Sequence, residues 1–385
     1  MRIAYYAPLK APDHPVPSGD RLMARQLDAA LRAGGHAVTL ASDLRSYCGD
    51  PDDYAHAGTI RRAADTERRR IAAGWADAGR AEAGWADAGR AEAGPPDLWV
   101  SYHPYAKSPD LIGPPLCARF AVPYVTIETS YSARRNLGVW RDSQAAVLAG
   151  IAGAVVNICL TARDRAGILA AAPAAVVADL PPFIDPAPFQ GPRRTAEGPV
   201  RLITVAMMRA GDKRASYGVL AAALERLPDA DWRLTVVGSG PQEAEVRALF
   251  AAITPERITW AGLCARDRVA DLLRASDLYL WPGQGEAYGL AYLEAQAAGL
   301  PVVAQDVAGV PEVVARDLTG VLTAPGTQAG DVAEYAAAID RLITDRAARC
   351  RMGQAAQVRV LARHSFVAAV ARLRHILLDI REAQR

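Results

Sequence analysis

The sequence predicts an α/β protein made of two domains, each built on a doubly wound parallel sheet. At 385 residues the chain is too long for one typical core and suits two domains of ordinary size. Short apolar or β-branched runs alternate with helical patterns, as they do in consecutive βαβ units. The same rhythm restarts after a proline-rich segment, residues 181–192, which favours a second domain.

The first half of the chain contains five runs with the length and composition of strands. In order they are Arg2 to Ala7, Val38 to Ala41, Leu98 to Ser101, Tyr124 to Ile127 and Ala154 to Ile158. Helical patterns lie between them, so parallel pairing is expected.

The second half repeats this arrangement. Its expected strands are Arg201 to Val205, Arg233 to Val237, Ile258 to Trp260, Leu278 to Trp281 and Val302 to Ala304. Residues 181–192 are too rich in proline for regular structure and suit an interdomain linker, so we place the domains at residues 1–196 and 197–364. Phe366 to Ile380 has apolar residues at helical spacing, which predicts an amphipathic helix within residues 365–385.

One internal repeat interrupts the first domain. The decapeptide from Gly74 to Ala83 recurs unchanged from Gly84 to Ala93. Two units are too few for a solenoid, and their glycines weaken a helix by about 1 kcal/mol each. The duplicated segment 74–93 is therefore expected to be an extended surface helix or loop; a binding role for Trp75 and Trp85 is the less favoured alternative.

Composition excludes several classes of function. Hydrophobic content of 51%, charged content of 22% and a mean hydropathy near zero describe a soluble globular protein without a membrane span. A formal net charge of +2 gives no global field for nucleic acid. Arg61, Arg62 and residues 68–70 form one basic stretch, for which a solvated helix face is favoured over peripheral contact with an anionic membrane.

The cysteines and the N-terminus point to the cytoplasm. Five widely spaced cysteines without a Cys-x-x-Cys pattern predict reduced core thiols. The first residues read as a strand and not as a signal peptide.

The most informative motif lies between residues 285 and 304, where two carboxylates stand eight positions apart in an otherwise apolar segment. A loop after the strand at Leu278 to Trp281 is expected to lead into a helix that ends at Gly299. Eight residues are a little over two helical turns, so Glu286 and Glu294 fall on nearly the same side and can face one ligand. The amide groups of Tyr288, Gly289 and Leu290 lie where this helix begins and can bind an anion such as a phosphate.

Basic and glycine-rich loops precede this motif in the second domain. Arg209 and Lys213 follow its first strand, at the carboxyl edge where open α/β sheets bind ligands. Gly238 and Gly240 follow its second strand in a glycine-rich turn. No Asp-x-Asp motif occurs at the site and no His or Cys cluster has ligand spacing, so neither a metal nor another cofactor is expected.

Together these segments resemble the retaining glycosyltransferases of family 4 (glycosyl transferases group 1), which have the GT-B fold. The resemblance implies two Rossmann-like domains facing across a cleft, a nucleotide-diphosphate-sugar donor held by the second and an acceptor held mainly by the first. It implies that Glu286 contacts the donor sugar hydroxyls and that Glu294 holds the ribose. Arg209 and Lys213 would clamp the diphosphate as catalytic cations, and Arg214 could substitute for Lys213.

The resemblance covers roughly residues 200 to 360, including residues 307–314 and 319–322. It makes Gly238 and Gly240 candidates for the donor site, together with Tyr288, Gly289 and Leu290.

The first domain matches less closely. Members of the family have a glycine pair near the donor phosphate, whereas this chain offers only Gly19, and Asp20 beside it is expected to cap the following helix. Where relatives often carry a histidine near the donor sugar, this chain has Glu128. Glu128 could bind an acceptor hydroxyl or act as a base, and a structural role as a cap or in an ion pair with Arg134 or Arg135 is equally expected. His103 and Lys107 follow the third strand at the same edge and are further candidates for the acceptor side.

The function that follows is transfer of a sugar from a nucleotide-diphosphate-sugar donor to a glycan, lipid or small-molecule acceptor, with retention and without a metal. Two alternatives stay open. One is an epimerase or hydrolase of nucleotide-sugars with the same fold, and the other is a nucleotide-sugar-binding protein that has lost transfer activity.

Overall fold

The computed structural model describes residues 1–16, 18–81, 94–192 and 198–383. The chain divides into two compact units. The first comprises Met1–Leu180 and Val370–Arg385, and the second is the continuous stretch Pro181–Ala369.

The first unit is built on a six-stranded parallel sheet with strand order β2-β1-β3-β4-β5-β6. The strands are β1 (Arg2–Tyr6), β2 (Ala37–Ser42), β3 (Leu98–Tyr102), β4 (Tyr124–Ile127), β5 (Val156–Cys159) and β6 (Val177–Asp179). The five predicted strands are therefore confirmed, and β6 extends the sheet beyond them. All five residues of β3 are buried, as expected for a central strand covered on both faces.

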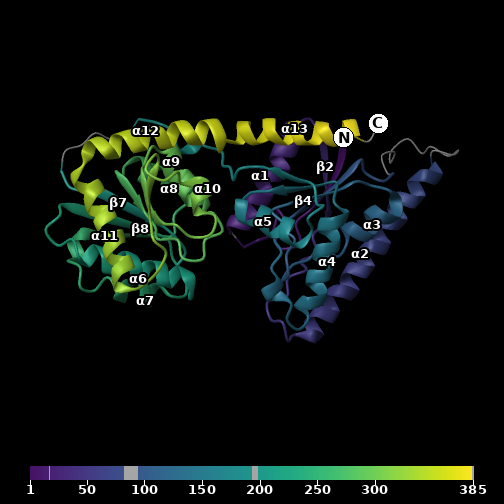
Figure 1. Cartoon of the computed structure of the whole chain (residues 1–385), viewed down its shortest axis with the longest axis horizontal. Coiled ribbons are helices and arrows are strands. Elements are labelled where there is room, and N and C mark those ends of the chain that lie inside the picture. Colours follow the sequence, from purple (N-terminus) through teal and green to yellow (C-terminus); the bar gives the residue numbers. More distant parts are fainter. Residues whose placement is uncertain (17, 82–93, 193–197, 384–385) are drawn as a thin grey trace. The chain divides into compact units, whose positions relative to one another are not determined.

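Helices follow these strands in alternation (Figure 1). They are α1 (Gly19–Ala33), α2 (Tyr54–Ala81), α3 (Gly113–Phe120), η1 (Ala133–Arg135), α4 (Trp140–Gly153), α5 (Ala162–Ala171) and, from Val370 on, α13 (Phe366–Ala383). The predicted C-terminal helix is thus confirmed. Its Arg372 Nε donates to the carbonyl of Asp179 at 3.0 Å, which ties α13 to the end of β6.

The second unit has a six-stranded parallel sheet with strand order β12-β11-β10-β7-β8-β9. The strands are β7 (Val200–Val205), β8 (Trp232–Val237), β9 (Ile258–Gly262), β10 (Leu278–Leu280), β11 (Val302–Gln305) and β12 (Gly320–Thr323). The helices are η2 (Ala187–Phe189), α6 (Asp212–Glu225), α7 (Glu243–Leu249), η3 (Pro255–Arg257), α8 (Arg266–Arg274), α9 (Leu290–Ala297), α10 (Val310–Val313), α11 (Ala329–Thr344) and α12 (Arg346–Arg363). All five strands expected here are present.

The proline-rich segment at residues 181–192 packs on the second unit. Phe183, Ile184 and Phe189 are fully buried there. Ile184 forms a parallel bridge with Ser365, and His364 Nδ1 lies 2.7 Å from the carbonyl oxygen of Pro182. The division between the units therefore falls at Leu180 and Pro181, before this segment, whereas the sequence suggested a boundary near residue 196.

The duplicated segment begins inside α2, which continues to Ala81 despite its glycines. Trp75, in the first copy, packs edge-on against Trp99 and Phe120, with ring centroids 6.3 and 5.2 Å apart. These contacts make Trp75 part of the core around β3. Trp85 and the rest of the second copy lie outside the described residues.

Most of the basic stretch on α2 is neutralised locally. Arg61 pairs with Asp142, and Arg70 pairs with Glu67. Among the cysteines, all of which are free, Cys350 is exposed, so not every thiol belongs to the core as the sequence suggested. Within the described helices, no segment is both long and apolar enough to cross a bilayer.

Candidate functional site

The predicted donor residues gather at the carboxyl edge of the second sheet. The loop after β7 carries Arg209 and leads into α6, whose second residue is Lys213. The loop after β10 carries Glu286 and leads into α9, which contains Glu294. Because β7 and β10 are paired neighbours in the sheet, their loops emerge side by side.

Lys213 and Glu286 form an ion pair across these two loops. The same oxygen, Glu286 Oε1, accepts a hydrogen bond from the indole Nε1 of Trp281 at 3.0 Å. The Lys213 ammonium also lies 5.4 Å from the centroid of the Trp281 ring. The two side chains are 26% and 17% exposed, so this charged pair is partly shielded from water yet open to a ligand.

The loop before α9 is shaped by glycines in the left-handed region. Gly283, Gly285 and Gly289 have φ of 84, 66 and 79°, and a Cβ on Gly285 would overlap the carboxylate of Asp212. The helix begins at Leu290, two residues later than predicted, with Gly289 as its N-cap. Within the described chain the amide groups of Gly289 and Leu290 make no hydrogen bond, so they remain available to an anion.

Glu294 lies in the middle of α9 and is half-buried. Burial raises the pKa of Glu294 to about 7, and the charge of Arg266 opposes that rise. The predicted end of the helix is confirmed by a Schellman motif. Gly299, at φ 78°, donates to the Gln296 carbonyl at 2.9 Å, and Leu300 donates to that of Ala295 at 3.0 Å.

Arg209 is exposed on its loop, and so is Arg214 on α6. Neither guanidinium has an ion-pair partner in the described part of the chain. The structure thus places Arg209 near the edge with a free positive charge, while Lys213 is already engaged by Glu286.

Gly238 and Gly240 serve close backbone packing. Their φ values are 136 and 159°, and a Cβ on either would overlap a carbonyl oxygen, that of Ala206 or that of Met208. The amide of Met208 donates to Ser239 at 3.0 Å, which holds the loops after β7 and β8 together. These glycines therefore shape the loop that carries Arg209.

The predicted residues His103 and Glu128 meet Asp20 at the carboxyl edge of the first sheet. His103 follows β3, Glu128 follows β4, and Asp20 lies in the first turn of α1 after β1. His103 Nδ1 is 3.7 Å from Asp20 Oδ1 and 3.7 Å from Glu128 Oε1. Asp20 was expected to cap α1, but Ser18 is the N-cap and accepts from the amide of Arg21 at 3.2 Å, which leaves the Asp20 carboxylate free to face His103.

Glu128 is the most buried of these groups, at 5% exposure. Burial raises the pKa of Glu128 to about 7, the positive charge of His103 opposes the rise, and the carboxylates of Asp164 and Asp20 add to it. The charges with the largest effect on this pKa are thus those of His103, Asp164 and Asp20, and not those of Arg134 or Arg135.

Lys107 and Gly19 are the other predicted residues of the first unit. The Lys107 ammonium lies 4.7 Å from the centroid of the Trp140 ring, so its described partner is an aromatic face. Gly19 is the first residue of α1, and a Cβ there would meet no atom within 4 Å. Open space at Gly19 leaves room for a ligand group.

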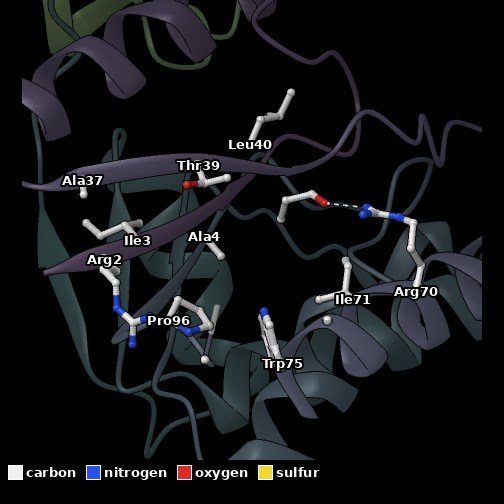
Figure 2. A pocket seen from close by; sticks show the side chains of 13 residues that line it. Arg2, Ile3, Ala4, Ala37, Thr39, Leu40, Arg70, Ile71, Trp75 and Pro96 are labelled. Atoms are coloured by element: carbon white, nitrogen blue, oxygen red, sulfur yellow. Dashed lines mark hydrogen bonds between the residues drawn. The ribbon is translucent and has the colours of Figure 1, made fainter. Parts of the chain in front are cut away.

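The pocket in Figure 2 is a different feature of the first unit. It has a volume of about 340 Å³ and lies between β1, β2 and α2. Its two arginines are engaged by backbone carbonyls: Arg2 donates to Pro95 at 2.7 Å, and Arg70 donates to Ala41 at 3.1 Å. Trp75 lines it, but none of the predicted donor or acceptor residues does, and we assign it no ligand.

Among the described residues, no group of three or more His, Cys, Asp or Glu side chains is placed to hold a metal ion.

A family model described as "Glycosyl transferases group 1" matches residues 199–345. These residues are a group 1 glycosyl transferase domain. The group 1 domain coincides with most of the second unit and contains Arg209, Lys213, Glu286 and Glu294.

Relatives and solved structures agree with this assignment. The D-inositol 3-phosphate glycosyltransferase of Pseudarthrobacter chlorophenolicus is 40% identical over 146 residues, which are 37% of this chain and 34% of that protein. The chain thus matches only about a third of the length of this curated relative.

Solved structures cover both units. Sucrose-phosphate synthase from Thermosynechococcus elongatus has a TM-score of 0.72 at 21% identity, with 100% of both chains covered. The Anabaena protein HepE in complex with UDP has a TM-score of 0.71 at 15% identity, with 98% of this chain and 100% of that chain covered. The chain has two six-stranded parallel sheets, and these solved structures match it over both units. Together these findings establish a two-domain, Rossmann-like α/β fold of the GT-B type.

Two site residues were not predicted from the sequence. Trp281, expected only as the end of a strand, hydrogen-bonds Glu286 in the group 1 domain. Its place one residue after a buried strand at the carboxyl edge was the available signal. Asp20 was expected to be a cap, because Ser18 and Asp20 both suit that role and the sequence does not choose between them.

Proposed function

We propose that the chain is a retaining, metal-independent glycosyltransferase of family 4, which transfers a sugar from a nucleotide-diphosphate-sugar to a carbohydrate, lipid or small-molecule acceptor. The observation that supports this best is the grouping of Lys213, Glu286 and Glu294 with the open amides of Gly289 and Leu290. An anionic diphosphate and the hydroxyls of a sugar and a ribose are the chemistry that such a group accommodates.

In this proposal the residues of the group 1 domain bind the donor. Arg209 and Lys213 stabilise the negative charge that grows on the diphosphate as the glycosidic bond breaks. Glu286 accepts hydrogen bonds from the sugar, and Glu294 accepts them from the ribose. The similar proteins support this assignment, since one is a D-inositol 3-phosphate glycosyltransferase and another, HepE, was solved in complex with UDP.

The carboxyl edge of the first unit binds the acceptor. His103 and Glu128 lie there, while the space at Gly19 is assigned to the donor phosphate. The reduced cysteines support a cytoplasmic location. Membrane contact through α2 is the less favoured alternative, because Arg61, Arg68 and Arg70 of its basic stretch are paired with carboxylates.

A donor screen tests the proposal. Unfolding temperature is measured with uridine-, guanosine- and adenosine-diphosphate sugars, for the wild type and for Glu294→Ala and Arg209→Ala. One nucleotide series should stabilise the wild type and lose its effect in both variants. Turnover should persist in EDTA, and the product anomer should match that of the donor. No stabilisation by any series would overturn the donor assignment, and binding without turnover would indicate a binding protein that has lost transfer activity.

A further inference from the structure

A second pocket of the first unit lies between α2 and α3 and is distinct from the pocket of Figure 2. It has a volume of about 300 Å³ and is lined by Asp65, Arg68, Arg69, Pro115, Leu116 and Arg119. The first three residues belong to α2 and the last three to α3. All of them lie within one compact unit, and none is a predicted donor or acceptor residue, so the pocket is a separate feature of the chain.

Positive charge in this pocket exceeds negative charge. The lining includes three guanidinium groups and one carboxylate, and that carboxylate, Asp65, is paired with Arg68. Within the described part of the chain neither Arg69 nor Arg119 forms an ion pair, and both side chains are exposed. The guanidinium groups of Arg69 and Arg119 are therefore available to an anion.

The two helices that form the pocket are held together by Arg68. Its Nη1 atom donates to the carbonyl oxygen of Leu111, just before α3 begins, at 2.7 Å. Arg119 lies over an aromatic ring, with its guanidinium carbon 5.1 Å from the ring centroid of Phe120. Leu116 is buried in the core cluster and anchors the same helix. Both walls of the pocket are thus placed before a ligand binds, which lowers the entropy cost of binding.

Arginines grouped in this way suit a phosphate group. The guanidinium group is planar, always charged, and presents its N–H donors in a fork that matches phosphate oxygens. A phosphomonoester carries about two negative charges near neutral pH, whereas a carboxylate carries one. The charges of Arg69 and Arg119 together therefore match a phosphomonoester better than a carboxylate.

The surroundings of the pocket favour a free molecule over a bilayer surface. Arg61 and Arg70 lie on the same helix outside the pocket, and both are paired with carboxylates. The uncompensated charge is thus concentrated in a hollow and not spread along α2. A volume of about 300 Å³ is at the lower end of the range for small-molecule sites.

We propose that the pocket between α2 and α3 binds the phosphomonoester group of a free small molecule. Arg69 and Arg119 contact the phosphate, and Arg68 joins the two helices that carry them. The inference does not rest on the proposed glycosyl transfer, because the pocket shares no residue with the donor or acceptor assignments. Failure of the donor screen would leave this site untouched.

Titration calorimetry with glycerol 3-phosphate tests the site. The wild type should bind it with a Kd of about 1 mM or below. Arg69→Gln and Arg119→Gln each remove one charge from an exposed side chain, so both variants should fold, and each should raise the Kd about tenfold or more. Arg209→Ala, in the predicted donor site, should leave the Kd unchanged.

Arg62→Gln is the matched control on α2. Arg62 is exposed, lies outside the pocket, and donates from Nη2 to Thr59 Oγ1 at 3.0 Å. The substitution removes the same charge and should not alter the Kd. The site would be overturned by equal affinity in Arg69→Gln, Arg119→Gln and the wild type, by a loss of affinity in Arg209→Ala, or by no binding up to about 10 mM.

Vesicles separate a free ligand from a lipid. Phosphatidic acid presents the same glycerol phosphate group on a bilayer surface. The protein should sediment with phosphatidylcholine vesicles containing phosphatidic acid no more than with phosphatidylcholine alone. Additional sedimentation that is lost in Arg69→Gln and Arg119→Gln would overturn the assignment to a free molecule and identify a membrane surface instead.

Discussion

The ammonium of Lys213 and the indole N–H of Trp281 meet on one oxygen of Glu286. One carboxylate oxygen thus joins the start of α6 to the loop before α9. The pair holds the two loops in place before any donor binds, and it provides a measurable link between stability and donor binding.

Replacing Lys213 by methionine should lower the stability of the protein and weaken its binding of the donor. Methionine keeps an apolar stem against Trp281 but removes the charge, so unfolding free energy should fall by about 1–2 kcal/mol. The Kd for UDP should rise about tenfold or more, since a charge-assisted contact to the diphosphate is lost. Denaturant unfolding with and without UDP measures both quantities.

Arg226→Met is the control for that variant, because Arg226 is exposed at the far end of α6. It should change neither quantity. Equal UDP affinity in Lys213→Met and the wild type would remove Lys213 from the donor site.

Glu294 predicts a pH dependence of stability. Its pKa is raised to about 7, above the usual 4.5, so the folded state holds more protons than the unfolded state between these values. The stability that this proton contributes is complete below about pH 4.5 and is lost as pH rises through about 7. The wild type should therefore lose unfolding free energy from pH 5 to 8, whereas Glu294→Gln should not show this loss. Parallel curves for the two proteins would rule out the raised pKa.

The same carboxylate should make donor binding depend on pH. An ionised Glu294 accepts hydrogen bonds from the ribose hydroxyls, whereas a protonated one accepts them poorly. The affinity for UDP-glucose, whose diphosphate does not titrate near neutrality, should fall below about pH 7. Titration calorimetry from pH 5.5 to 8 checks this. The pH dependence should disappear in Glu294→Gln, and its persistence there would point to another group.

His364 should act on stability in the opposite direction. Burial lowers the pKa of His364 to about 4, below the usual 6.5, so the unfolded state binds more protons between these values. The contribution of neutral His364 is present above about pH 6.5 and is lost as pH falls through about 4. His364→Gln should lose less stability than the wild type on acidification, as followed by denaturant midpoints. An identical acid dependence would contradict this assignment.

Two glycine substitutions should separate packing from binding. Gly238→Ala places a Cβ on the Ala206 carbonyl at a φ of 136°, so it should destabilise the protein by about 2 kcal/mol or more. Gly19→Ala meets open space at the start of α1 and should leave stability unchanged. Its effect should instead be weaker binding of the nucleotide-sugar, measured by calorimetry. Loss of stability in Gly19→Ala comparable to that in Gly238→Ala would contradict the distinction.

Strand periodicity predicted both sheets because their central strands are continuous apolar runs. The strand β6 escaped prediction because it is three residues long and only partly buried, at the edge of its sheet. The segment at residues 181–192 was misleading for a different reason. Its prolines exclude regular structure, as predicted, but its buried phenylalanines bind it to the second unit, and composition alone does not reveal that packing.

The site could be predicted as far as one rule reaches: the carboxyl ends of parallel strands lie at the same edge of a sheet. That rule placed Lys213 near Glu286 and His103 near Glu128. The facing of His103 toward Asp20 depends on left-handed turns at His103 and Glu128, which are uncommon for these residues and leave no pattern in the sequence. The pairing of Lys213 with Glu286 in preference to Arg209 or Arg214 likewise depends on where α6 begins.

The discontinuity of the first unit has a consequence for synthesis on the ribosome. The second unit is one continuous stretch, Pro181–Ala369, whereas the first also needs residues from Val370 on. During translation the second unit can therefore complete its contacts while the first still lacks the part of α13 from Val370 on, and Arg372 reaches Asp179 only after it has left the exit tunnel. The first unit is therefore the first to be synthesised and the last whose residues are all available for folding.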